Sequence, residues 1–153
     1  MNWEAIGAGG EILGAIAVLV TLIYLARQVS HSTKQARLDA ILAVNSSNDS
    51  AFEPVYIPEN SVIFSKGQQS YSSLEAHEEI VFNMLMTRLI ASFSATTYQY
   101  EQGSYDEELY WGTASFYASF IASPGGADWF MKNKNLFSKS AVEKLENIAE
   151  KSK

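Results

Sequence analysis

The feature that most constrains this chain is an apolar segment at its start. Between Ala5 and Ala26 the one charged side chain is Glu11, and the run from Ile12 to Ala26 carries no charge. A helix that crosses a bilayer needs roughly 20 mostly apolar residues, because the hydrocarbon layer is about 30 Å thick. We therefore expect a transmembrane helix here. A buried core helix of a soluble domain is the alternative.

The two ends of the segment favour a spanning helix and predict its orientation. A helix would place Trp3 and Tyr24 about 31 Å apart, which matches the aromatic belts at the two faces of a bilayer. The chain begins Met-Asn-Trp-Glu without the basic residues of a cleavable signal peptide, so we expect an uncleaved anchor. Arg27, Lys34 and Arg37 follow the segment, and no lysine or arginine precedes it. The positive-inside rule then predicts an outer N-terminus and a cytoplasmic C-terminal body.

Small residues recur along one side of the predicted transmembrane helix. They alternate at spacings of three and four and form what we call the small-residue seam: Gly7, Gly10, Gly14, Ala17 and Thr21. Such a seam permits close approach of two helices, and Gly10–Gly14 is a GxxxG pair. We expect self-association or contact with another membrane protein through it. The alternative is that glycine is simply common in transmembrane helices.

Glu11 lies beside this seam, two turns inside Trp3. A carboxylate that faces lipid is costly, so Glu11 should face another helix or a water-filled path, or be protonated. In an oligomer, a ring of Glu11 side chains could bind cations or relay protons. The alternative is a shallow position from which the side chain reaches the outer headgroups.

The rest of the chain predicts an all-α protein with one small domain. We expect the transmembrane helix and its juxtamembrane extension to occupy residues 1–44 and to end near Asn45, in the polar run Asn-Ser-Ser-Asn-Asp-Ser. Residues 45–73, which contain Pro54, Pro58 and Gly67, are expected to form an irregular segment that connects this helix to the following domain. Residues 74–153 should form a cytoplasmic helical bundle.

Local signals place the helices of that bundle. Two capping boxes are predicted, Ser72 with Glu75 and Ser104 with Glu107. The sequence Pro124-Gly125-Gly126 should break the chain, Asp128 should begin a short helix, and Ser138 should cap the last one. Asn83 and Arg88 interrupt the apolar helix over 80–98, so we do not expect a second transmembrane span.

Arg88 is the most informative polar residue of the predicted bundle. A buried arginine needs an acidic partner, and the following turn and helix offer Glu101, Asp106, Glu107 and Glu108. We expect a structural, buried ion pair. Binding of an anionic ligand is the alternative.

Several stretches resemble a widespread family of small, uncharacterised bacterial membrane proteins. The resemblance rests on Asn2-Trp3-Glu4-Ala5-Ile6-Gly7, Glu11-Ile12, Gly14-Ala15-Ile16-Ala17 and Thr21-Leu22-Ile23-Tyr24-Leu25-Ala26. Later landmarks are Gly103, Trp111, Pro124-Gly125 and Trp129, whereas Gly126-Ala127 and Phe130 depart from the family pattern. The resemblance implies an all-α body on an N-terminal anchor in the bacterial inner membrane, and it implies no activity.

Composition narrows the function. Residues 45–128 carry two basic side chains against eleven acidic ones, so nucleic acid is not an expected partner. Glu75 and His77 stand once as Glu-x-His rather than as the paired Glu-x-x-His of di-metal bundles, and no nucleophile motif or phosphate loop occurs. We expect no catalytic residue, metal or cofactor. The prediction is a non-enzymatic membrane-anchored scaffold, accessory subunit or homo-oligomer; an ion- or proton-conducting oligomer and a ligand-binding sensory module are the alternatives.

Overall fold

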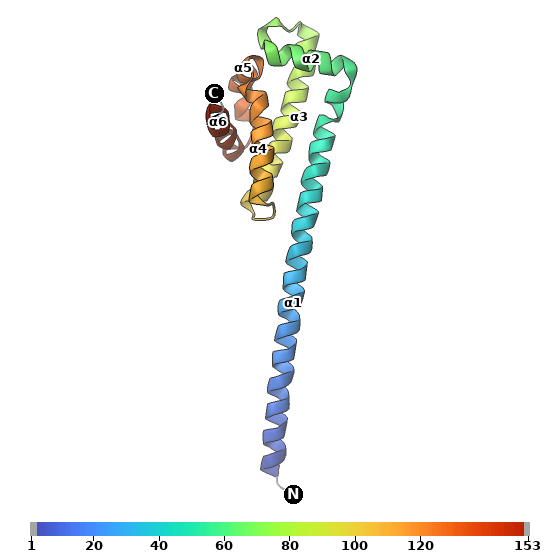
Figure 1. The fold of residues 1–153 in the computed structure, drawn as a ribbon, viewed down its shortest axis with the longest axis vertical. Coiled ribbons are helices and arrows are strands. Elements are labelled where there is room, and N and C mark those ends of the chain that lie inside the picture. The colour runs from blue at the N-terminus through green and yellow to red at the C-terminus, as the bar shows by residue number, and fades with distance from the viewer. Residues whose placement is uncertain (1–2, 152–153) are drawn as a thin grey trace. The chain divides into compact units, whose positions relative to one another are not determined.

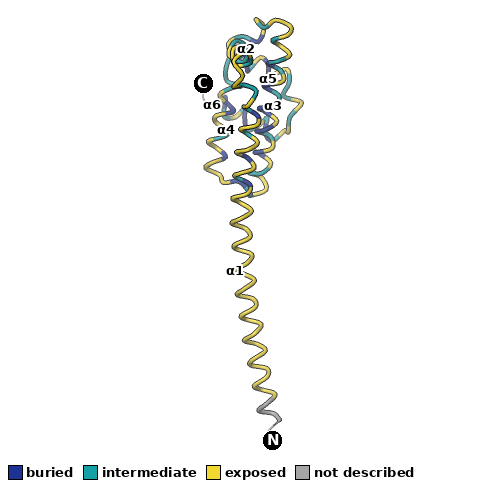
Figure 2. The backbone as a smooth tube through the Cα atoms, turned by 90° about the vertical axis from the view of Figure 1, so that its right-hand side faces the viewer, coloured by how far each residue is buried: buried dark blue, intermediate teal, exposed yellow. Residues whose placement is uncertain are grey.

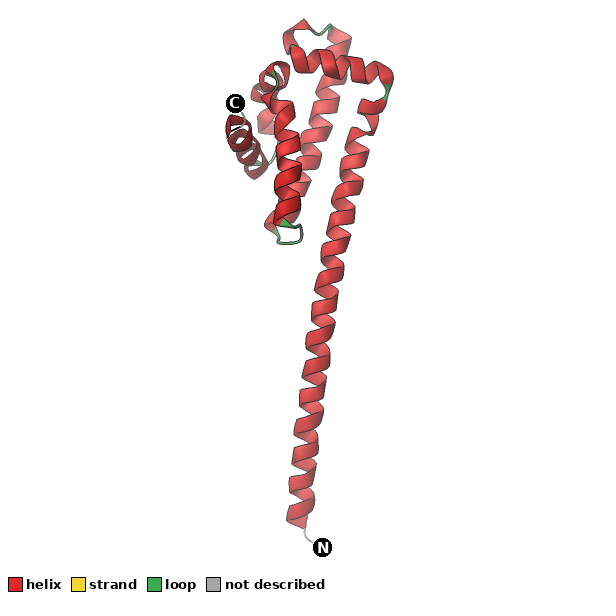
Figure 3. Ribbon diagram, in the orientation of Figure 1, coloured by secondary structure: helices red, strands yellow, loops and turns green. Residues whose placement is uncertain are grey.

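The described part of the chain, residues 3–151 of a computed structural model, consists of helices joined by short loops and contains no strand (Figures 1 and 3). Asn2, where the family-like motif begins, lies outside the described residues, as do the side chains of residues 3–6. The all-α prediction is confirmed. The elements are α1 Trp3–Phe52, η1 Glu53–Tyr56, α2 Pro58–Gln69, η2 Tyr71–Ser73, α3 Ala76–Glu101, α4 Glu107–Ala122, α5 Pro124–Asn133, η3 Lys134–Leu136 and α6 Lys139–Lys151.

The chain divides into an N-terminal unit, Met1–Leu38, and a C-terminal unit, Asp39–Lys153. In the N-terminal unit every described side chain from Gly7 onward is exposed (Figure 2). The C-terminal unit has its own hydrophobic core. The two units thus differ in kind: the first is an apolar helix that buries none of its described side chains, and the second is a packed domain.

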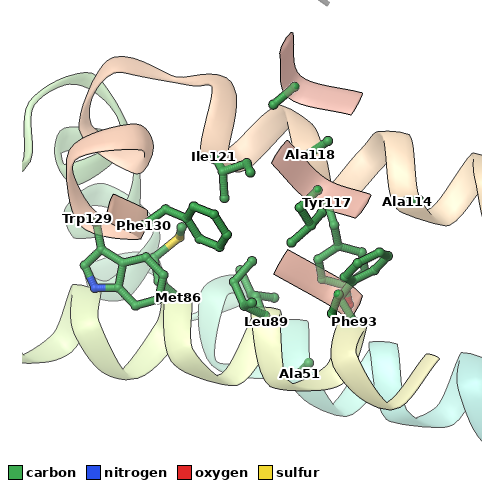
Figure 4. Close-up of a cluster of buried hydrophobic side chains, with 14 of the residues drawn as sticks. Ala51, Met86, Leu89, Phe93, Ala114, Tyr117, Ala118, Ile121, Trp129 and Phe130 are labelled. Atoms are coloured by element: carbon green, nitrogen blue, oxygen red, sulfur yellow. The ribbon is translucent and has the colours of Figure 1, made fainter. Parts of the chain in front are cut away.

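The core of the C-terminal unit is built on one face of α3. Phe82, Met86, Leu89, Ile90 and Phe93 are all fully buried, and their spacing places them on adjacent turns of a single helix face. Figure 4 shows Met86, Leu89 and Phe93 directed toward the side chains of α4 and α5. This face therefore supplies the surface on which the other helices pack.

Helices α4, α5 and α6 close the core from the other side. Helix α4 packs against α3, α5 and α6, and α2 packs against α3 and α5. Their buried side chains include Tyr110, Tyr117 and Ile121 of α4, Trp129 of α5 and Leu145 of α6. Residues 109–122, which carry no charge, thus belong to a helix that packs into the core.

The connecting segment predicted over 45–73 is mostly helical, which corrects the expected boundary at Asn45. Helix α1 continues to Phe52, and α2 follows after one turn of 3-10 helix. Within the polar run, Asn48 accepts hydrogen bonds from Ser92 and Tyr117, while Val44 and Ala51 are buried. Tertiary contacts therefore outweigh the local preference of Asn and Ser for turns.

Three of the predicted helix starts are also corrected. The capping box of α3 is formed by Glu75 and Glu78 rather than by Ser72 and Glu75. Asp106, not Ser104, caps α4 by accepting from two backbone N–H groups. Helix α5 begins at Pro124, with Ser123 as its N-cap, so Asp128 lies inside it. Ser138 does accept from the backbone N–H of Ala141 at the start of α6, as predicted.

Close backbone approach, more than flexibility, explains the glycine after Pro124. Gly125 of α5 lies against Gly67 of α2, and a Cβ at position 125 would overlap the carbonyl oxygen of Gly67. Gly112 of α4 has no neighbour within 4 Å of where its Cβ would stand. The two helical glycines therefore have opposite requirements.

We predict that Gly125→Ala lowers the free energy of unfolding of the C-terminal unit by about 1–3 kcal/mol, because backbone must move to admit the methyl group. Gly112→Ala is the matched control. It should raise the same quantity by about 0.5–1 kcal/mol, since alanine costs less backbone entropy in a helix. Chemical denaturation followed by circular dichroism measures both, and equal effects of the two substitutions would contradict the packing.

Candidate functional site

The first candidate site is the apolar surface of α1. Its large side chains are exposed, for example Leu13 at 70% and Leu19 at 59%. Helices α1 and α3 are the two in the described part of the chain that are long and apolar enough to cross a membrane. They differ in burial, since the most apolar window of α1 is 0% buried and that of α3 is 50% buried. The exposed apolar surface therefore belongs chiefly to α1.

The small-residue seam lies on this exposed surface. A Cβ added at Gly7, Gly10 or Gly14 would meet nothing within 4 Å. The hydroxyl of Thr21 donates to the carbonyl oxygen of Ala17 at 2.8 Å, so this polar group is satisfied within its own helix. Packing within the chain thus gives no reason for glycine at these positions.

Glu11 is exposed beside the seam. Within the described residues its carboxylate has no hydrogen-bond or ion-pair partner. A partner for Glu11 would have to come from another molecule or from solvent. Its role in an oligomer stays a prediction.

Arg88 does not form the predicted buried ion pair. It is exposed on α3, and its Nη2 donates to the backbone carbonyl oxygen of Ser50 at 2.7 Å. The last carbonyls of a helix lack partners within it and carry partial negative charge, and α1 has no basic residue in its last turn. Arg88 therefore caps the end of α1 from a neighbouring helix. Glu101, one of the expected partners, binds Lys144 instead.

A groove, the second candidate site, opens beside Arg88 between α3 and the segment that follows α1. Its larger hollow has a volume of about 600 Å³ and is lined chiefly by side chains of α3, with Pro54 of η1 and Asn60 of α2. A smaller hollow of about 460 Å³ lies between α3 and the end of α1. Arg88 and Ala91 line both. We call the two hollows together the Arg88 groove. The sequence singled out Arg88 as a possible anion-binding residue, but it could not predict the groove because the lining residues are scattered over 47–95.

A buried polar network joins three helices near this groove. The hydroxyl of Tyr117 donates to Asn48 Oδ1 at 2.9 Å, and the Ser92 hydroxyl donates to the same oxygen at 3.1 Å. Burial raises the pKa of the Tyr117 hydroxyl, so it stays a neutral donor. No buried side-chain nitrogen or oxygen in the described residues lacks a partner. The network is satisfied internally and serves packing.

Asn83, predicted to interrupt an apolar helix, has a similar role. Its Oδ1 accepts from the indole N–H of Trp129 at 2.7 Å and from the Tyr71 hydroxyl at 3.1 Å. The Tyr71 hydroxyl also donates to Glu79 at 2.7 Å. Burial, followed by the neighbouring Glu79 carboxylate, raises the pKa of Tyr71. Asn83 thus connects α3, η2 and α5.

The acidic start of α3 is a capped helix end. Glu78 binds Lys66 and accepts from the backbone N–H of Glu75, and the hydrogen bond from Lys66 is the main cause that lowers the pKa of Glu78. His77 lies 3.7 Å from Glu75 in an exposed pair. Among the residues that the structure describes, no group of three or more His, Cys, Asp or Glu side chains could hold a metal ion.

No protein-family model matches the chain, and no curated protein or solved structure gives a significant match. The resemblance to small bacterial membrane proteins stays a prediction from the sequence motifs.

One ion pair makes the stability of the C-terminal unit dependent on pH. Lys144 Nζ lies 2.7 Å from Glu101 Oε1, and its hydrogen bond, with a second from Ser140, lowers the pKa of Glu101. A carboxyl group whose pKa is lower in the folded chain than in the unfolded chain stabilises the fold at pH values above the unfolded pKa of about 4.3. This stabilisation is lost as the pH falls through the pKa of the folded chain.

We predict that Lys144→Met makes the free energy of unfolding fall less on acidification than it does in the unaltered chain. Chemical denaturation at neutral and acidic pH measures this difference.

Lys139→Met is the control for this experiment. Its ammonium lies 3.9 Å from Glu143 at an exposed end of α6, where an ion pair contributes little. This variant should keep the wild-type pH dependence, and an equal change in both variants would argue against the Glu101 pair.

Proposed function

We propose that α1 spans the bacterial inner membrane near residues 5–26, with an outer N-terminus, and tethers the C-terminal unit as a small cytoplasmic helical bundle. In this proposal the protein is a non-enzymatic membrane component, a homo-oligomer or an accessory or scaffold subunit that assembles through the small-residue seam. Membrane lipid and a second transmembrane helix are its partners. The motif shared with small bacterial membrane proteins supports the choice of membrane.

The single observation that carries the proposal is the exposure of an uncharged helix surface. Residues 12–26 carry no charge, and all of them are exposed. Exposed apolar surface costs roughly 25 cal/mol per Å² in water, and soluble monomers rarely show a contiguous apolar patch of more than a few hundred Å². Lipid would remove this cost on every side of the helix at once, and the backbone polar groups of residues 12–26 lie inside α1, where the hydrogen bonds of the helix satisfy them.

The seam supports assembly within the membrane. Because the glycines of the seam face open space, they would let a second helix approach the backbone of α1 closely. Gly9, by contrast, lies about 120° around the helix from the middle of the seam. Gly9 and Gly14 thus form a matched pair of positions, one outside the seam and one on it, for testing the contact.

We predict that Val18→Arg releases the protein from membranes, because an arginine at the centre of a transmembrane helix costs about 2.5–3.5 kcal/mol for insertion. Leu38→Arg, which adds the same charge at an exposed position outside the uncharged run, should leave membrane association unchanged. Membranes washed with alkaline carbonate and then assayed for retained protein give the readout. Full solubility of the unaltered chain without lipid or detergent would refute the anchor.

We predict the orientation of single-cysteine variants in intact cells, since the chain itself contains no cysteine. Ala5→Cys should react from outside intact cells with a maleimide that cannot cross the membrane, and Ser104→Cys should react after lysis alone. The reverse pattern would contradict the proposed topology.

We predict that Gly14→Leu weakens self-association at least tenfold, because a bulky side chain on the seam keeps two helices apart. Gly9→Leu makes the same chemical change away from the seam and should leave the oligomer intact. Mass determination of the full chain in mild detergent distinguishes the two variants. If Gly14→Leu assembles like the unaltered chain, the seam is not the contact.

A further inference from the structure

The charge distribution of the C-terminal unit leaves one arginine without an acidic partner. Residues 45–128 contain two basic side chains, Lys66 and Arg88, against eleven acidic ones. Lys66 is bound to Glu78. Arg88 makes one hydrogen bond, to the carbonyl oxygen of Ser50, and no ion pair within the described residues. A guanidinium group has five N–H donors, so most of its capacity to bind an anion is unused.

Both hollows of the Arg88 groove have this guanidinium as their one charged lining group. Asp49 of α1 and Glu53 of η1 are the carboxylates adjacent in sequence to the lining residues Ser50 and Pro54, and neither of them lines a hollow. In a chain of net charge −6, the groove is thus a local site of positive charge. Its electrostatics favour an anion and disfavour a cation.

Apart from Arg88, the larger hollow is mainly apolar. Val81, Met84 and Leu85 of α3 line it together with Pro54, and Met84 is 69% exposed. Ile80, one turn before Met84, is 62% exposed. A volume of about 600 Å³ lies within the 300–1,000 Å³ range of small-molecule sites. The smaller hollow adds the polar lining residues Ser47, Ser50 and Ser92 close to the arginine.

We propose that the Arg88 groove binds an amphipathic carboxylate, a single acyl chain that ends in a carboxylate group. The carboxylate binds the guanidinium of Arg88, and the chain lies along Val81, Met84 and Pro54. Arginine and carboxylate match in geometry because two parallel N–H donors meet two oxygens. Arg88 then has two functions, since one N–H caps α1 and the others hold the ligand. This site lies outside residues 5–26 of α1 and outside the seam, so the proposal does not rest on the proposed anchor.

The probe is decanoate, and decanol is its uncharged analogue of the same chain length. The full chain is reconstituted in phosphatidylcholine nanodiscs, and thermal unfolding is followed by circular dichroism while each compound is added. A ligand that binds the folded state raises the melting temperature in a saturable way. We expect a saturable rise with decanoate and an apparent affinity at least tenfold lower for decanol. Equal affinities would overturn the role of the charge.

Three variants locate the site. Arg88→Gln keeps a donor for the Ser50 carbonyl but removes the charge, and we expect it to weaken decanoate binding about tenfold. Met84→Asp places a carboxylate on an exposed position of the groove and should weaken binding by a similar factor, which tests the site even if Arg88→Gln fails to fold. Arg37→Gln removes an exposed arginine of the N-terminal unit and should bind decanoate like the unaltered chain.

Two further results would overturn the proposal. Unchanged decanoate affinity in Met84→Asp would place the ligand elsewhere. A rise in melting temperature on replacing phosphatidylcholine with phosphatidylglycerol, lost in Arg88→Gln and without any effect of decanoate, would mean that a lipid phosphate occupies the groove instead.

Discussion

Burial of one face of α3 is the interaction on which the C-terminal unit depends. Phe82, Leu89 and Phe93 are completely removed from solvent, and side chains from α1, α4, α5 and α6 join the same cluster. Side chains of this size each gain roughly 1.5–3 kcal/mol on burial, so the α3 face can hold several short helices that would be unstable alone. The groove described above lies on the remaining, exposed part of the same helix.

Polar side chains inside this unit select one arrangement of the helices. Asn48 accepts from α3 and α4, and Asn83 accepts from α5 and η2. A buried polar group costs free energy when it lacks a partner. Sliding one helix along another would break these bonds, whereas apolar contacts alone tolerate small shifts. The two asparagines therefore contribute specificity that hydrophobic packing lacks.

The two candidate sites are surfaces that the chain leaves unsatisfied. On α1 the unsatisfied property is the exposed apolar surface of residues 12–26, which lipid or another apolar helix would cover. In the Arg88 groove it is a positive charge beside apolar side chains, for which an amphipathic anion is the complement. An anchored protein with such a groove would have the parts of a ligand-responsive membrane component.

The sequence by itself determined the helical class of this protein and the apolar character of its first helix, because both follow from periodicity and from a long run without charge. It also located the core helix over 80–98 and the Ser138 cap. It did not determine where α1 ends, because the polar run after Asn45 favours a turn locally and only contacts of Val44, Asn48 and Ala51 with other helices keep it helical. The sequence also did not determine the partner of Arg88, because only the tertiary structure places the carbonyl oxygen of Ser50 within hydrogen-bonding distance of its guanidinium group.

The tertiary structure also brings residues up to 48 positions apart together in the groove. The sequence could not show this, because packing geometry is a property of the assembled helices and not of any one segment.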